Sequence, residues 1–190
     1  MKIVLASTSP RRLELLRGLG LRVKVVDSRV RESKFNISDP EKLVKTLALT
    51  KAKEVARRVR GGLIIGADTI VVLKGKILGK PKDEEEAKSM LRELSGKTHE
   101  VLTGLAVIDA STGKTKVDFV RSRVKFKRLS EGEISNYVVT DKPFDKAGAY
   151  SIQGKAGLFV EKIDGCYFNV VGLPLSRLAE ILKEFDVTLV

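Results

Sequence analysis

The chain has 190 residues, of which 43% are hydrophobic and 32% charged, a composition typical of a globular protein with one domain or two small lobes that share a core. No apolar run approaches the roughly 18 residues of a membrane span. The single cysteine excludes an internal disulfide, and with only one histidine beside it the chain cannot form a metal site with several Cys or several His ligands. The net charge of +12 favours anionic partners, either polynucleotides or small phosphates, although a thermophile-like surface would explain the same excess. The apolar start is too short for a secretory signal, so we expect a cytoplasmic protein.

The first expected elements are a short buried strand at residues 2–6 and a helix that begins at Pro10. Proline suits the first helical position because its fixed φ fits the helix and its missing N–H costs nothing there. Ser9 is the expected N-cap. A second strand is predicted at residues 21–27.

Two cations occupy the first turn of this helix. Arg11 and Arg12 lie where the helix dipole disfavours positive charge. Guanidinium groups, exposed first-turn amides and the three hydroxyl residues at 7–9 together indicate a site for a phosphate. The alternative is a pair of solvated arginines.

A longer helix is predicted from residue 40 to about residue 60. Its start carries two competing signals, which are Asp39 as N-cap before a proline and a capping box formed by Ser38 and Glu41. Within its apolar face, Lys51 falls between residues 47 and 55. Its ammonium group either reaches outward to solvent or points into a polar cavity.

The continuous apolar run at residues 63–73 predicts a strand covered on both faces. Asp68 and Thr69 are its only polar side chains. A carboxylate in such a place is costly unless it is paired or binds a metal. The functional interpretation competes with a buried aspartate that is satisfied by the backbone or by an arginine.

The rest of the chain continues the alternation of strands and helices. The remaining expected elements are a strand at 77–79, a helix capped by Asp83 that ends at 95–96, a hairpin of 98–109 and 114–128, a helix from the capping box of Ser130 and Glu133 to about 139, a polar loop at 141–157, a strand at 158–163, and a last helix with Leu175, Leu178, Leu182 and Phe185 on its buried face. This order predicts an α/β fold with a mixed sheet.

A basic stripe at residues 121–127 alternates with less polar residues in the second strand of the hairpin. It could contact a nucleic-acid backbone. A solvated sheet face is the favoured interpretation, because no aromatic residues lie between the charges to stack on bases.

The candidate chemical groups all suit phosphate. They are the cations Arg11, Arg12, Lys51 and Lys80 and the carboxylates Glu32 and Asp68. Oxygen ligands suit Mg²⁺ or Mn²⁺, and the GxxxxGK[ST] and GxGxxG loops of common nucleotide enzymes are absent. The residues therefore indicate metal-assisted hydrolysis of a phosphoanhydride.

Eight segments in order resemble the Maf family of nucleoside triphosphate pyrophosphatases. They are LASTSPRR (5–12), Glu32, ALTKA (48–52), GADTIV (66–71), ILGKP (77–81), the segment from Glu85 through LSGKTHEVLTG (94–104), GAYSIQGKAGLFVEKIDG (148–165) and NVVGLPL (169–175). The resemblance implies a two-lobed α/β structure around a long mixed sheet, formed by residues 1–190 as a single domain, with the nucleotide in a cleft between the lobes. It also implies a homodimer and a divalent metal.

The same resemblance assigns roles to single residues. Asp68 matches the proposed general base and, with Glu32, the metal ligands, while Lys51 and Lys80 match catalytic positions. The substrate positions are Ser7, Arg11, Arg12, Thr69 and Gln153. The combination of Arg11, Thr69 and Gln153 is similar to the subgroup that converts dTTP and UTP to the monophosphate and diphosphate. The alternatives are the 7-methyl-GTP specificity and a non-catalytic module that binds nucleic acid or has a regulatory role.

Overall fold

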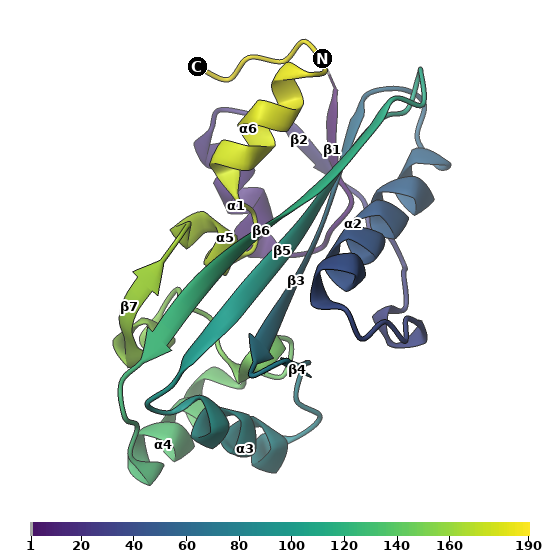
Figure 1. Ribbon diagram of the computed structural model, residues 1–190. Coiled ribbons are helices and arrows are strands. Elements are labelled where there is room, and N and C mark those ends of the chain that lie inside the picture. The colour runs from purple at the N-terminus through teal and green to yellow at the C-terminus, as the bar shows by residue number, and fades with distance from the viewer. Residues whose placement is uncertain (1) are drawn as a thin grey trace. The chain divides into compact units, whose positions relative to one another are not determined.

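The computed structural model describes residues 2–190, and Figure 1 traces its elements along the chain. The helices are α1 (Pro10–Gly18), α2 (Pro40–Ala56), α3 (Glu84–Leu94), α4 (Glu131–Asp141), α5 (Tyr167–Val171) and α6 (Leu175–Lys183). The strands are β1 (Ile3–Leu5), β2 (Val23–Val25), β3 (Leu63–Leu73), β4 (Lys76–Leu78), β5 (Thr98–Asp109), β6 (Thr115–Phe126) and β7 (Val160–Asp164). Short 3-10 turns are η1 (Glu32–Lys34), η2 (Ala147–Ala149) and η3 (Lys155–Phe159).

The strands pair in the order β2-β1-β3-β5-β6-β7, with β4 paired to β3. The pairs β1–β2 and β1–β3 are parallel, whereas β3–β4 and β6–β7 are antiparallel. The predicted α/β fold with a mixed sheet is therefore confirmed. None of the helices in residues 2–190 is long and apolar enough to span a membrane.

The chain divides into two compact units, as the prediction of two lobes requires. Unit 1 consists of the described residues up to Asp68 together with Thr103–Val120 and Gly172–Val190. Unit 2 consists of Thr69–Leu102 and Arg121–Val171. Three of the four boundaries fall inside β3, β5 and β6, and the fourth lies directly after α5. The single domain over residues 1–190 and a nucleotide cleft between lobes stay predictions.

The core of unit 1 lies on both faces of its strands. Successive strand residues point to opposite faces, so Ile3 and Leu5 of β1 pack in one apolar cluster with α1 and α6. Val4 and Ala6 pack in a second cluster with α2. Figure 1 shows α2 on one side of β3 and α1 and α6 on the other. Burial on both faces explains why the β3 sequence is apolar without alternation.

Two glycines let α2 lie directly on the strands. A Cβ atom at Gly66 of β3 would lie 2.2 Å from the carbonyl oxygen of Ala48 in α2. A Cβ atom at Gly104 of β5 would lie 2.2 Å from the carbonyl oxygen of Val44. Both distances are too short for any real Cβ contact. The absent side chains therefore set the depth at which α2, with Lys51 on its buried face, packs against β3.

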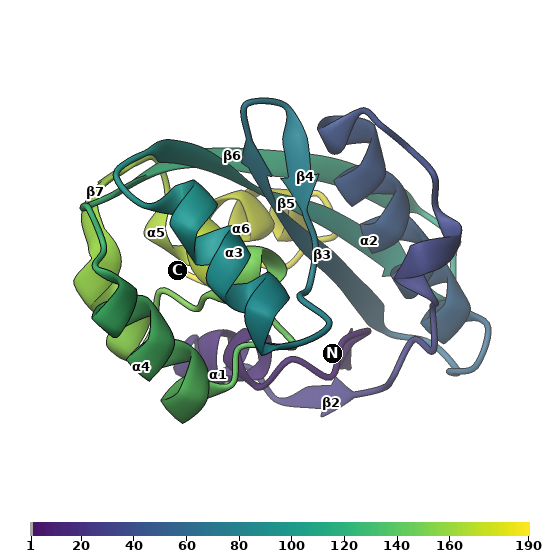
Figure 2. The ribbon, with the colours of Figure 1, turned by 90° about the horizontal axis from the view of Figure 1, so that it is seen from below.

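Unit 2 is held together by helix packing and an aromatic cluster. Helices α3 and α4 pack against each other, as Figure 2 shows. The aromatic cluster joins rings from β5, β6, α4, η3 and the loop between α4 and η3 through edge-to-face contacts. Its members are His99, Phe126, Tyr137, Tyr150 and Phe159. Edge-to-face pairs stabilise a core beyond the area that they bury.

His99 is buried in this cluster, and its Nε2 lies 2.8 Å from the hydroxyl oxygen of Tyr150. Burial lowers the pKa of His99 from 6.5 to about 4. The folded protein keeps the ring neutral while the unfolded chain takes up a proton below pH 6.5. The stability that His99 contributes is therefore present above pH 6.5 and is lost as the pH falls toward 4.

We expect the free energy of unfolding to fall by about 2 kcal/mol between pH 7.5 and pH 5 because of this one histidine. Urea unfolding at the two pH values measures the difference. The His99→Gln variant should lose this pH-dependent step, because glutamine does not titrate. A step of the same size in the variant would contradict the assignment to His99.

Most helix starts agree with the sequence, and two helix features do not. The Asp39 carboxylate accepts from the backbone N–H groups of Glu41 and Lys42, so Asp39 is the N-cap of α2. The helix ends at Ala56 rather than near residue 60, ahead of the glycine pair at 61–62. Helix α5 was not expected, because five residues give no helical periodicity.

The basic stripe reaches the surface, as the solvated-face interpretation predicted. Arg121 and Arg123 are exposed and Lys125 and Lys127 are half-buried, whereas the alternating residues Ser122 and Val124 are buried. Arg121 lies 3.5 Å from a Glu100 carboxylate oxygen across the sheet. Such exposed pairs contribute little stability, but they place negative charge beside the stripe and so weaken its attraction for a polyanion.

Candidate active site

The first turn of α1 holds a buried arginine. Ser9 occupies the N-cap position, but its side chain makes no capping hydrogen bond, and its N–H donates to the Ser7 hydroxyl at 3.3 Å. Arg12 is 9% exposed, and its Nη1 donates to the same Ser7 hydroxyl at 3.1 Å. Its Nε donates to the carbonyl oxygen of Gly172 at 2.7 Å. The guanidinium group is thus oriented by Ser7 and Gly172, two residues of unit 1 that are far apart in the sequence.

The charge of Arg12 has acidic neighbours. Burial lowers the pKa of Arg12, and the nearby carboxylates of Asp68 and Glu32 oppose that shift. These acids explain why a cation is tolerated at the start of a helix, where the dipole disfavours it. Arg11, half-buried in the same turn, contributes a second positive charge close to Arg12.

Lys51 bridges two carboxylates. Its side chain is on the buried face of α2, and the residue is 7% exposed. Its Nζ donates to Glu32 Oε1 at 2.6 Å and to Asp68 Oδ1 at 2.5 Å. Of the two possibilities left open by the sequence, the polar cavity is therefore right, because the ammonium group points at acids inside the unit.

Asp68 is 5% exposed in the middle of β3. Burial raises the pKa of Asp68 above its ordinary value of 3.8, and the charge of Glu32 acts in the same direction. Lys51, and more weakly Arg12, act in the opposite direction. The net shift of the pKa is upward, because desolvation of a carboxylate in a strand covered on both faces exceeds the effect of one ammonium group. A carboxylate with a raised pKa is the better proton acceptor.

The two carboxylates have the donor set of a magnesium or manganese site. Glu32 and Asp68 each direct one oxygen to the same cationic atom, so their oxygens already converge on one point. No group of three or more His, Cys, Asp or Glu side chains in residues 2–190 could hold a metal ion. Two carboxylates suit the usual coordination of Mg²⁺ in proteins. The ion binds one or two protein carboxylates and completes its coordination shell with water and substrate phosphates.

Three predicted site residues belong to unit 2. Thr69 follows Asp68 on β3 and is half-buried, Lys80 is exposed after β4, and Gln153 is half-buried just before η3. The loop with Gln153 is tied to the Lys80 segment, because the Gly148 N–H donates to the Gly79 carbonyl oxygen at 3.0 Å.

The contacts within unit 1 bring together five of the predicted residues, namely Ser7, Arg12, Glu32, Lys51 and Asp68. Arg11 joins them through its place in the same helical turn. The participation of Thr69, Lys80 and Gln153 in this site stays a prediction.

Sequence reasoning missed two supports of the site. The Gly172 carbonyl that orients Arg12 is 160 residues away along the chain, and no local pattern reveals such a pairing. Gly66 could have been found, because an isolated glycine inside a strand pattern indicates a bulge or a close backbone approach.

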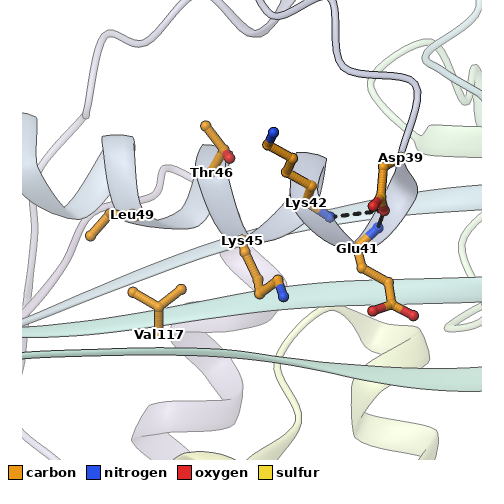
Figure 3. Close-up of a pocket in the computed structure, with 7 residues that line it drawn as sticks. All are labelled: Asp39, Glu41, Lys42, Lys45, Thr46, Leu49 and Val117. Atoms are coloured by element: carbon orange, nitrogen blue, oxygen red, sulfur yellow. Dashed lines mark hydrogen bonds between the residues drawn. The ribbon is translucent and has the colours of Figure 1, made fainter.

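A separate groove of about 450 Å³ lies over the start of α2 in unit 1. Figure 3 shows its lining residues, which are Asp39, Glu41, Lys42, Lys45, Thr46, Leu49 and Val117. None of the predicted site residues lines it. The Asp39 carboxylate already accepts from the first-turn amides there, so the helix start offers little to an anion.

Comparison with known proteins identifies the family. The family model described as Maf-like protein matches residues 2–185. The chain belongs to the Maf family. Its relatives include a protein named dTTP/UTP pyrophosphatase from Pelotomaculum thermopropionicum, which is 51% identical over 97% of this chain and 96% of the relative. Another, of the same name, is from Desulforamulus reducens and is 54% identical over 99% of this chain and 98% of the relative.

A solved structure of a HAM1 protein from Coxiella burnetii is similar in fold to this Maf family member. The TM-score is 0.54 with 16% sequence identity, over 97% of this chain and 99% of that one. At this identity the likeness concerns the fold alone.

Proposed function

We propose that the protein is a nucleoside triphosphate pyrophosphatase that hydrolyses dTTP and UTP to the monophosphate and diphosphate. The observation that carries the proposal is the cluster in which buried Lys51 joins buried Asp68 to half-buried Glu32 beside Arg12. It combines a proton acceptor with phosphate-binding cations. The names of the relatives, which cover nearly the whole chain, support the reaction and the two nucleotides.

In this reaction a water oxygen attacks the α-phosphorus, the bond from that phosphorus to the bridging oxygen breaks, and diphosphate leaves. Asp68 accepts the proton of the water, for which its raised pKa suits it. The positive charges that stabilise the developing phosphate charge belong to Arg11, Arg12, Lys51 and Lys80. The buried position of Arg12 makes its charge more effective than it would be in water.

Glu32 and Asp68 would hold a divalent cation, Mg²⁺ or Mn²⁺. When bound, such an ion polarises phosphoryl oxygens and neutralises their charge. The protein residues keep the carboxylates oriented, because Asp68 is fixed on β3 and Glu32 begins the short turn η1.

Recognition of the base is assigned to Thr69 and Gln153. A glutamine amide offers both a donor and an acceptor to a pyrimidine edge, and such a site discriminates strongly against a base that leaves these groups unpaired. Ser7 holds Arg12 in place for the phosphates. We further propose a homodimer in the cytoplasm that acts on free nucleotides rather than nucleic acid.

Diphosphate release from dTTP, UTP, CTP, GTP, ATP and 7-methyl-GTP, each with Mg²⁺ or Mn²⁺, tests the proposal. We expect turnover of dTTP and UTP. Turnover of 7-methyl-GTP alone would keep the reaction and overturn the assignment of Thr69 and Gln153. If no nucleotide is hydrolysed, a salt titration against DNA tests the binding-module alternative.

The pH dependence of turnover should reflect Asp68. Its ionised form is the base, and its pKa lies above 3.8, so we expect kcat to fall as the pH drops, with a midpoint above that of an ordinary aspartate. Measurement of kcat for dTTP across the acid range gives this midpoint. A rate that stays constant down to pH 4 would contradict the role of Asp68 as base.

A further inference from the structure

The ammonium group of Lys51 occupies the point at which Glu32 and Asp68, the two carboxylates proposed to hold the metal, converge. Its Nζ lies 2.6 Å from Glu32 Oε1 and 2.5 Å from Asp68 Oδ1. A divalent cation held by the same two oxygens would need the same place, because Mg²⁺ binds oxygen at about 2.0–2.1 Å. Lysine and metal therefore exclude each other from these two oxygens.

The local charge also opposes a free metal ion. Glu32 and Asp68 supply two negative charges, while Lys51, Arg12 and Arg11 supply three positive ones. Asp68, Lys51 and Arg12 are buried, so these charges are poorly screened by solvent. A divalent cation that enters this cluster meets no net negative charge.

A nucleoside triphosphate changes this balance because its phosphates bring several negative charges. They can receive a displaced ammonium group, and Lys51 has the flexible four-carbon stem that such a movement requires. Arg12 donates hydrogen bonds to Gly172 and Ser7 and therefore lacks this freedom.

We propose that Lys51 is the resident cation of the carboxylate pair and competes with the divalent metal for it. The metal replaces the ammonium group when the nucleotide phosphates are present to bind Lys51. The nucleotide part rests on the proposed hydrolysis of nucleotides, whereas the competition rests only on the proposed metal site of Glu32 and Asp68. Lys51 thereby couples metal binding to substrate binding.

The test is Mn²⁺ affinity without nucleotide, measured by electron paramagnetic resonance on the whole protein. Lys51→Met removes the charge and keeps an apolar stem, so it should bind Mn²⁺ about tenfold more tightly than the wild type, within the usual range of coupling between sites. Lys51→Arg retains a cation and should remain close to the wild type. Lys53→Met, at an exposed position of the same helix, is the matched control and should show no change.

Equal or weaker Mn²⁺ binding by Lys51→Met would overturn the competition. Circular dichroism checks that the variant is folded, and Lys51→Gln takes its place if it is not. In a second measurement, dUTP with an α,β-imido bridge should strengthen Mn²⁺ binding about tenfold more in the wild type than in Lys51→Met. Equal strengthening would overturn the link to the nucleotide. If no nucleotide is hydrolysed, the proposed function is wrong. The competition between Lys51 and Mn²⁺ measured without nucleotide is still tested by the first measurement.

Discussion

Asp68→Asn is expected to lower turnover of dTTP by about 10²–10⁴-fold, the usual contribution of a general base, without lowering the free energy of unfolding. The amide keeps the shape of the side chain and cannot accept the proton. The ionised carboxylate is costly in the buried β3 strand, because its pKa is raised there. This cost is present at neutral pH and disappears as the pH falls below 3.8, where both folded and unfolded chains carry the protonated acid. The variant should therefore be as stable as the wild type or more stable at neutral pH.

Steady-state diphosphate release and urea unfolding measure the two effects. Asp118→Asn is a suitable control, because it makes the same chemical change in a carboxylate that pairs with Arg177 in unit 1. Its turnover should remain at the wild-type level. Near-normal turnover by Asp68→Asn would remove Asp68 from both its proposed roles.

Gly66→Ala should destabilise the fold by about 3 kcal/mol or more and abolish turnover. The added Cβ atom would lie 2.2 Å from the carbonyl oxygen of Ala48, and backbone cannot give way as a flexible side chain can. Helix α2 must move away from β3. That movement separates Lys51 on α2 from Asp68, which is only two residues beyond the glycine.

Urea unfolding and a turnover assay on the same preparation test this prediction. Gly18→Ala is the matched control, because Gly18 is the last residue of α1 and a Cβ atom there would meet nothing within 4 Å. It should be neutral or stabilising by up to about 1 kcal/mol. Wild-type stability in Gly66→Ala would mean that α2 packs less closely than its backbone indicates.

Local signals predicted the fold well. The sequence Asp39-Pro40 correctly predicted the start of α2. The apolar run at 63–73 has the same bounds as β3. Helix α5 was missed because its five residues are too few to show helical periodicity, although three of them are buried. Ser9 was placed correctly at the start of α1, but its hydroxyl does not cap, since the hydrogen bonds in this loop involve Ser7 instead.

The site was predictable to the extent that its residues break local rules. Lys51 on an apolar helix face and Asp68 in an apolar strand are each unfavourable alone, and this pointed to them. Their pairing was not predictable from spacing, because it depends on how closely α2 approaches β3. The same holds for Arg12, whose carbonyl partner Gly172 comes from the other end of the chain.

The bond between Arg12 and Gly172 also makes the site sensitive to cleavage far from it in the sequence. Leu178, Ile181 and Leu182 supply part of the unit 1 core beside β1 and β3. A protease that removed residues 172–190 would uncover this apolar surface and would take away the carbonyl partner of the guanidinium group. Such a cut should therefore abolish nucleotide binding even though it leaves Ser7, Glu32, Lys51 and Asp68 in the chain.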